Sequence, residues 1–296
     1  MSSSILTNYG SMVALQSLQA TQTALTNTEN QISSGLSVSS ASDNASAWTI
    51  ANTMKSNVAS LNQVSTDLGN AGSILTTAVS GAGQVSSLVS QIRAKIASFT
   101  DTSQDPTAIQ SEVTQLVSQI GATIQSSSFN GVNLLDSSQP KGLTFLASTN
   151  NDYSGGGTSP TISTGTTTDL SSTSTNTAAA AFYTLVGNLG TAITNSTPAT
   201  QQTNLDTALQ QVDAFNAVVE SSASTLGAVQ TNVTSQQTFV QNLATTMTQG
   251  VSNMVDADMT KESAQLSALQ TQQQLGTQAL SIANQAPQML LKLFGG

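Results

Sequence analysis

The 296-residue chain contains no cysteine and no histidine. It can therefore form no disulfide and offers no thiolate, and it lacks the commonest general base and metal ligand. Asp256, Asp258 and Glu262 come closest to a carboxylate cluster, but they lack the glycine turn and the full ligand set of a calcium loop. We therefore expect no enzyme activity, no metal site and no cofactor.

Charge is also scarce, because only 7% of the residues are charged, against about 25% in an average domain. The net charge is −9. The cations are scattered along the chain, at Lys55, Arg93, Lys95, Lys141, Lys261 and Lys292. Nucleic-acid binding requires clustered cations, so this composition excludes it, and anionic membrane surfaces are disfavoured for the same reason.

Long apolar runs are missing too. The N-terminus has no basic region followed by an apolar stretch, so we expect no cleaved signal peptide. No apolar run reaches the roughly 18 residues that a membrane-spanning helix needs, so we expect no membrane span. Aromatic residues make up 4% of the chain, which leaves few large side chains for a round core. Long helices that bury a narrow apolar stripe suit this composition better.

What the chain does have is an apolar residue at every seventh position in both halves. The first row is Met54, Leu61, Leu68, Leu75, Ala82, Val89 and Ile96. The second row is Leu205, Val212, Val219, Leu226, Val233, Val240, Met247 and Met254. This repeat predicts two long helices that meet along a coiled-coil seam. A parallel row beside the second one is interrupted by Ser222, Gln236 and Gly250.

The two ends of the chain carry the same spacing more weakly. Near the N-terminus the row is Leu18, Leu25 and Ile32, flanked by Leu15 and Leu36. Near the C-terminus the rows contain Met259, Leu266, Leu269, Leu280, Ala283 and Leu290, and Gln273 and Gly276 interrupt them. These patterns predict further helices at both ends.

The middle of the chain has a different character. Asp105 before Pro106 predicts a helix start, and the turn residues Phe129–Gly131 predict its end. Residues 143–145 and 161–163 predict short strands within a Gly/Ser/Thr-rich stretch, and residues 178–189 predict a helix. The predicted fold is mainly α, with long antiparallel coiled-coil helices from both termini and a small β-hairpin-rich tip.

Four short motifs at both ends resemble those of bacterial flagellins. On the N-terminal side they are QISSGL at 31–36 with SASDNA at 40–45, and SFNGVNLL at 128–135. On the C-terminal side they are VDADM at 255–259 and ANQAPQ at 283–288. The resemblance covers about residues 1–138 and 200–296. It implies a secreted homopolymeric subunit of the extracellular flagellar filament, used in swimming motility and exported by the flagellar type III apparatus.

The resemblance also implies a division of the chain. Residues 1–42 and 253–296 would form the two halves of an inner-tube domain, and 43–138 and 178–252 the two halves of an outer-tube domain. Residues 139–177 would be a short exposed insertion. The expected partners are other copies of the chain, an export chaperone, and the cap and hook-junction proteins. The polymer interface is expected to use Leu15, Leu18, Leu25, Ile32, Leu36, Leu266, Leu269, Leu280, Leu290 and Phe294. The outer-tube seam is expected to use Leu61, Leu68, Leu75, Val89, Val212, Val219, Leu226, Val233, Val240 and Met247.

The sequence departs from the family pattern at several positions. Ser37, Ser42 and Asn253 stand where flagellins often carry Arg, Lys and Arg, so ion pairs between subunits are doubtful there. Flagellins that activate the vertebrate innate receptor carry Arg, Leu and Glu at positions that match Gln91, Lys95 and Glu112. Since two of these three are changed, weak or no receptor activation is expected.

Two further expectations follow from the residues. Residues 1–46 contain too few large apolar side chains to offset the entropy of ordering their backbone, so they should be disordered in the monomer and fold on polymerisation. Trp48, a single aromatic residue on an apolar face, should lie in the core. The alternative function is that of a hook–filament junction protein, which shares similar termini. An adhesin or receptor coiled coil would need the signal peptide or membrane span that we do not expect.

Overall fold

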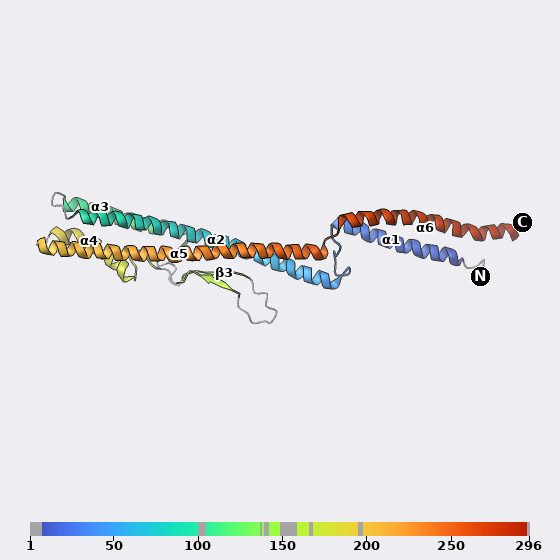
Figure 1. Cartoon of the computed structure of the whole chain (residues 1–296), viewed down its shortest axis with the longest axis horizontal. Coiled ribbons are helices and arrows are strands. Elements are labelled where there is room, and N and C mark those ends of the chain that lie inside the picture. The colour runs from blue at the N-terminus through green and yellow to red at the C-terminus, as the bar shows by residue number, and fades with distance from the viewer. Residues whose placement is uncertain are drawn as a thin grey trace. The chain divides into compact units, whose positions relative to one another are not determined.

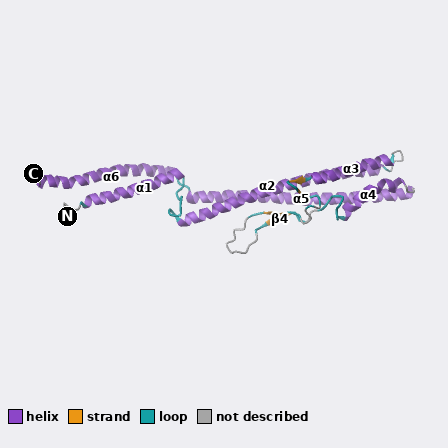
Figure 2. Ribbon diagram, turned by 180° about the vertical axis from the view of Figure 1, so that it is seen from behind, coloured by secondary structure: helices purple, strands orange, loops and turns teal. Residues whose placement is uncertain are grey.

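The structure, a computed structural model, describes residues 8–99, 105–136, 138, 142–148, 159–165, 168–194 and 198–294. Side chains are described throughout this part except at 194, 198–199 and 286–294. The helices are α1 (Tyr9–Ser34), α2 (Ala45–Ser98), α3 (Pro106–Ser126), α4 (Thr177–Thr194), α5 (Pro198–Val255) and α6 (Met259–Phe294). The strands are β1 (Ser128–Phe129), β2 (Val132–Asn133), β3 (Thr144–Leu146) and β4 (Thr161–Ser163). The prediction of a mainly α fold with long terminal helices and small hairpins in the middle is confirmed (Figures 1 and 2).

The chain divides into two compact units, which are described separately. Unit 1 contains Met1–Val58 and Thr245–Gly296, and unit 2 contains Ala59–Ala244. The helices α2 and α5 therefore each contribute residues to both units. Among the described residues, none of the helices combines the length and the apolarity needed to cross a membrane.

In unit 2, α2 and α5 pack against each other in antiparallel orientation. Gln230 Nε2 donates to Thr76 Oγ1 at 2.8 Å, and Arg93 Nε donates to Asp213 Oδ1 at 2.7 Å. Residue numbers thus rise on α2 as they fall on α5. The side chains at the seven-residue spacing between these polar contacts are almost fully excluded from water. This burial is the main stabilising contribution of the unit.

The helix α3 begins where the sequence indicates. The Asp105 carboxylate accepts from Thr107 N at 2.9 Å, and Pro106 occupies the first turn, where its missing N–H costs nothing. Farther along α3, the Gln110 amide bridges two backbone groups of α4. Its Nε2 donates to Val186 O at 2.8 Å, and its Oε1 accepts from Gly190 N at 2.7 Å. The two helices are thereby fixed in register.

The helix α4 is also anchored to α5 by aromatic packing. The rings of Phe182 and Phe215 stack with centroids 4.4 Å apart, and Tyr183 packs edge-on against both. Burial, with a smaller contribution from the Asp169 carboxylate, raises the pKa of Tyr183 to about 12. Its hydroxyl therefore stays protonated at neutral pH, and it donates to Leu170 O at 3.0 Å.

A β-hairpin with a two-residue turn follows α3. The strands β1 and β2 are antiparallel, and Asn130 and Gly131 between them both have positive φ, at 51° and 79°. Asn-Gly is the preferred pair for such a turn, because both residues tolerate the left-handed region. The Asn133 side chain closes the hairpin onto α3, donating to Ile124 O at 2.6 Å.

The second hairpin lies in the middle of the chain. The strand β3 pairs with β4 in antiparallel register, with Phe145 opposite Ile162. The first strand is predicted at 143–145, one residue early, whereas 161–163 is predicted correctly. The hairpin is held on α5 by Gln236, whose Nε2 donates to Ala147 O at 2.9 Å. Along the described part of the chain, the four strands all come after α3 and before α4, and Figure 2 draws them in orange.

In unit 1, α1 and α6 form an antiparallel pair, with the start of α1 beside the end of α6 (Figure 1). A small apolar core joins the beginning of α2 to the end of α5, through Ala51, Val251 and Val255. The segment between α1 and α2 adds a backbone bridge between Leu36 and Asp256.

The prediction that Trp48 lies in the core is wrong, because its residue surface is 39% exposed. Trp48 lies in the first turn of α2, one turn before Ala51, which packs against Val251 and Val255. Since α5 ends at Val255, no further turn of that helix is available to cover the indole.

Candidate functional site: the paired terminal helices

The pair formed by α1 and α6 leaves most of its apolar side chains uncovered. Among the side chains that the structure describes in these helices, those buried are Leu25, Thr28, Glu262 and Leu269. The exposed large apolar side chains of the pair are Tyr9, Met12, Val13, Leu15, Met259, Leu275 and Ile282. Tyr9 and Ile282 are 76% and 68% exposed. Uncovered large apolar side chains in such number on one helix pair mark an interaction surface.

The residues predicted for the polymer interface fall into three groups. Leu25 and Leu269 lie between the helices, each 9% exposed. Leu18, Ile32, Leu36, Leu266 and Leu280 are half-buried along the pair, and Leu15 is exposed. The side chains of Leu290 and Phe294 lie outside the described part of the chain. Two helices alone therefore leave these positions only partly covered.

Asn8 ties the beginning of α1 to the far part of α6. Its Oδ1 caps α1 by accepting from Ser11 N at 3.1 Å, and its Nδ2 donates to Ala283 O at 2.8 Å. Pro287 stands four residues after Ala283 and has no N–H, so it cannot make the usual helical hydrogen bond to that carbonyl. The Asn8 amide supplies the missing donor.

Further contacts between α1 and α6 are polar and uncharged. Ser11 Oγ donates to Asn284 Oδ1 at 2.7 Å, and Gln273 Nε2 lies 3.4 Å from Gln22 Oε1. A Cβ at Gly276 would stand 3.2 Å from Leu18 Cδ1, so the glycine permits a close approach of the helices. Gln273 and Gly276, which interrupt the apolar rows, thus both face α1.

The turn after α1 is built from backbone contacts. Gly35 ends the helix in the left-handed region, with φ of 70°, and its carbonyl accepts from Ala257 N at 2.9 Å. The Asp43 carboxylate accepts from the backbone and the hydroxyl groups of Ser40 and Ser39, and these hydrogen bonds lower its pKa. The Asp43 carboxylate therefore forms its hydrogen bonds within its own loop.

Glu262 is a buried carboxylate near the beginning of α6. The residue is only 7% exposed, and its Oε2 finds no hydrogen-bond partner in the described part of the chain. Asp258, the nearest carboxylate in sequence, caps α6 by accepting from Thr260 N at 3.0 Å. No group of three ligand-type side chains among the described residues could hold a metal ion.

The residues predicted for the outer-tube seam lie inside unit 2, apart from Met247, which belongs to unit 1. Leu61, Leu68, Leu75, Val89, Val212, Val219, Leu226, Val233 and Val240 are all buried, whereas Met247 is half-buried. Of the receptor-equivalent positions, Gln91 is exposed, and Lys95 Nζ pairs with Glu112 Oε2 at 2.6 Å on the surface.

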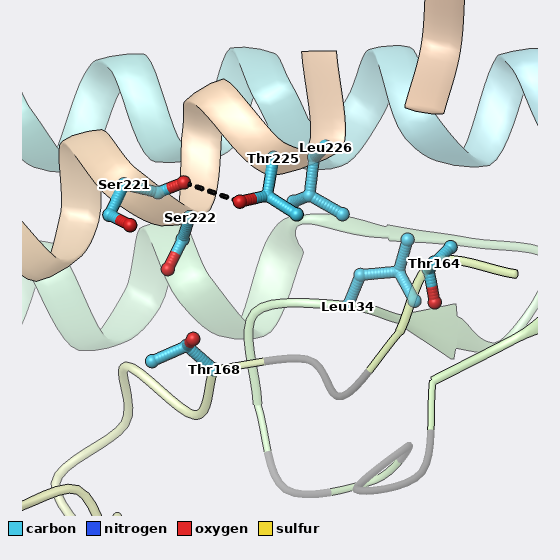
Figure 3. A pocket seen from close by; sticks show the side chains of 7 residues that line it. All are labelled: Leu134, Thr164, Thr168, Ser221, Ser222, Thr225 and Leu226. Atoms are coloured by element: carbon cyan, nitrogen blue, oxygen red, sulfur yellow. Dashed lines mark hydrogen bonds between the residues drawn. The ribbon is translucent and has the colours of Figure 1, made fainter. Parts of the chain in front are cut away.

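Sequence reasoning missed what the interruptions in the α5 row do. Gln236 binds the β3–β4 hairpin, and Ser222 borders a cavity of about 50 Å³ where the middle segment covers α5. Figure 3 shows Ser222 and Thr225 facing Thr164 and Thr168 across this space, with the Thr225 hydroxyl bonded to Ser221 O. Ser222 Oγ donates to Val218 O at 2.8 Å, so its hydroxyl is satisfied within the helix. A polar residue at a regular apolar position is the signal that could have indicated this contact.

The chain is similar to known proteins over its whole length. Residues 5–140 match the family model of the bacterial flagellin N-terminal helical region, and 204–294 match that of the C-terminal helical region. It is 37% identical to a flagellin of Brucella melitensis over 294 residues, which cover 99% of both chains. It is 36% identical to flagellin C of Rhizobium meliloti over 318 residues, covering 98% of this chain and 99% of the relative. It is 35% identical to flagellin FljK of Caulobacter vibrioides over 294 residues, with 98% of each chain covered.

Proposed function

Because the chain belongs to the bacterial flagellin family and is a structural, non-enzymatic subunit of the extracellular flagellar filament, we propose a role for each of its parts. Residues 1–42 and 253–296 form the inner tube of the filament. Residues 43–138 and 178–252 form the outer tube, and 139–177 are a short exposed insertion. The matches to flagellin at both ends favour the filament subunit over the hook–filament junction protein.

The observation that carries this proposal is the unequal burial of the two kinds of helix. The seam of α2 and α5 in unit 2 is excluded from water, whereas α1 and α6 leave side chains such as Met12, Leu15 and Ile282 uncovered. Uncovered apolar surface of this kind is stabilised when neighbouring copies remove it from water. Of the predicted interface residues, such neighbours would cover those that the helix pair leaves exposed or half-buried, which are Leu15, Leu18, Ile32, Leu36, Leu266 and Leu280.

It follows that the pairing of α1 with α6 is coupled to polymerisation. Few side chains are buried between the two helices, and the hydrogen bonds that join them, such as that from Asn8 to Ala283, are worth only about 1 kcal/mol each. This is too little to offset the entropy of ordering residues 1–46 in a free monomer. The terminal segments of a free subunit therefore stay unfolded, and the subunit stays unpolymerised, until neighbouring copies supply further contacts.

Hydrogen exchange tests this coupling. In the isolated monomer, the backbone amides of 9–34 and 259–285 should exchange with little protection, whereas those of 61–96 should be strongly protected. In assembled filaments all three segments should be protected, and exchange of the terminal segments should slow by about 100-fold or more. The amides of 61–96 are the internal control. Rigid, fully protected termini in the monomer would contradict the proposal.

Export and assembly partners belong to the same proposal. An unfolded terminus suits passage through the flagellar type III apparatus with a dedicated chaperone, and the subunit would add at the tip beneath the cap, above the hook-junction proteins. Uncharged side chains such as Gln270, Gln274 and Gln278 would give a channel wall that binds passing chains weakly. The low charge of the chain supports this last point.

We expect weak or no activation of the vertebrate innate receptor. Gln91 and Lys95 replace the Arg and Leu of activating flagellins, and Glu112, the residue that is retained, is engaged by Lys95 at 2.6 Å. In a receptor-reporter assay the monomer should be at least about 10-fold less potent than a strong enteric flagellin. The matched variant Gln91→Arg with Lys95→Leu should recover part of the potency. Equal potency of the unmodified chain would contradict this expectation.

A further inference from the structure

The turn between β1 and β2 contains the only asparagine of the chain that is followed by glycine, Asn130 before Gly131. Every other asparagine precedes a residue that carries a side chain. The difference matters for reactivity, because a glycine has no Cβ to hinder its backbone nitrogen as that nitrogen approaches the preceding side chain. This dipeptide is therefore the place in the sequence where an asparagine amide can react most readily with its own main chain.

The structure leaves both reacting groups open. Asn130 and Gly131 are exposed, and among the described residues neither the Asn130 amide nor the Gly131 N–H has a hydrogen-bond partner. A Cβ built on Gly131 would meet no atom within 4 Å. Neither a hydrogen bond nor a neighbouring side chain thus hinders the approach of Gly131 N to Asn130 Cγ.

The turn is also weakly held. The strands on either side of it contain two residues each, and both residues of β1, Ser128 and Phe129, are exposed. So short a hairpin opens locally at a much lower free energy than the buried helices of unit 2. Local opening lets the backbone rotate at Asn130, as closure of a ring between the side chain and the main chain requires.

Asn133, in the same hairpin, has the opposite environment. The residue is only 4% exposed and is followed by Leu134. Its Nδ2 donates to Ile124 O at 2.6 Å, and its Oδ1 accepts from Leu135 N at 2.9 Å. Both ends of this amide are engaged, so Asn133 should not react while the hairpin is folded.

We propose that Asn130 and Gly131 form a site of spontaneous deamidation. Gly131 N bonds to Asn130 Cγ, the bond between Cγ and Nδ2 breaks, and the Gly131 proton leaves with Nδ2 as ammonia. Water then adds to the cyclic imide and breaks one of its two C–N bonds, which gives either aspartate or isoaspartate. Water is the only co-reactant, and no second protein takes part.

The isoaspartate product changes the hairpin itself. Its main chain runs through the former side chain and is longer by one carbon between residues 130 and 131. Because a two-residue turn sets the register of β1 and β2, this extra atom opposes the pairing of Phe129 with Val132. Since the filament lies outside the cell, the product accumulates with the age of the subunit.

Ageing the full-length monomer in warm, mildly alkaline buffer made with heavy-oxygen water tests the proposal. Digestion and mass spectrometry, with fragmentation to locate the modified residue, should find heavy oxygen at residue 130. The product there should exceed that at Asn133 by at least about 10-fold, because Asn133 reacts only after the hairpin opens. An isoaspartyl methyltransferase should label the aged chain, and hydrogen exchange should show lost protection at 128–133 but not at 61–96.

Asn130→Gly is the matched control. Gly-Gly also suits a turn with positive φ at both positions, so the thermal unfolding of the fresh monomer should not change while methyl labelling after ageing is lost. As much product at Asn133 as at Asn130, or product at Asn130 only in urea-unfolded chain, would overturn the proposal. Equal labelling of the aged Asn130→Gly variant would place the reaction at another residue and would overturn it as well.

Discussion

Deleting residues 277–296 is expected to abolish filament formation and to leave a soluble helical monomer. The deletion removes the half-buried Leu280 and the exposed Ile282, and it removes Ala283, whose carbonyl accepts the Asn8 hydrogen bond. The remaining part of α6 is too short to pair with the beginning of α1. Electron microscopy after seeding should show no filaments, and sedimentation should show a monomer.

The same deletion leaves unit 2 untouched, which gives the experiment its internal check. The chemical denaturation midpoint of residues 61–96 and 205–240 should be the same as in the full-length monomer, because their seam lies within Ala59–Ala244. A shorter deletion of Gly295 and Gly296 removes no side chain that could be buried, so it should still polymerise. Filaments from the 277–296 deletion would show that the end of α6 is dispensable.

Replacing Gly81 by alanine is expected to destabilise unit 2 by about 2 kcal/mol. A Cβ at this position of α2 would stand 2.8 Å from Ser127 Cβ and 3.0 Å from Leu135 Cδ1, and closer still to Ser127 Oγ. Neither neighbour can move freely, since Ser127 is buried and donates to Thr123 O, and Leu135 is fully buried. The free energy of unfolding of the monomer, from urea denaturation followed by circular dichroism, measures the effect.

Gly83 provides the matched control, two residues farther along the same helix. It is exposed, and a Cβ there would meet no atom within 4 Å. Gly83→Ala should therefore stabilise the monomer by about 0.5–1 kcal/mol, because alanine loses less backbone entropy in a helix. The two substitutions thus have opposite signs. A neutral or stabilising Gly81→Ala would mean that α3 and the β1–β2 hairpin do not lie against α2 as the structure places them.

The parts of the fold that could be predicted are those that a local pattern specifies. Spacing by sevens predicts α2 and α5, because a buried seam between two helices must recur with that period. Asp105 and Pro106 predict the start of α3, since both act within one turn. The turn at Asn130 and Gly131 is predicted from two adjacent residues, although the two strands beside it are not, because strands of two residues carry no periodicity.

What could not be predicted depends on contacts between distant residues. Trp48 shares an apolar face with Ala51, and only the end of α5 at Val255 decides that one is exposed and the other buried. Gln236 looks like a defect in an apolar row until the hairpin that it binds is placed beside it. For the candidate site, the rows at both ends indicate which residues face a partner helix. They do not indicate that Asn8 supplies a donor to a carbonyl that Pro287 leaves unpaired.

The scarcity of charge affects how the cohesion of the filament depends on the ionic strength of the medium. Within the described residues, the ion pairs are those of Arg93 with Asp213 and Lys95 with Glu112, and both stand at the surface. Exposed pairs contribute about 0–1 kcal/mol each and weaken as mobile ions shorten the Debye length. Cohesion through apolar contacts and amide hydrogen bonds has no comparable dependence on ionic strength. A fibre made of such subunits should keep its strength from fresh water to brine.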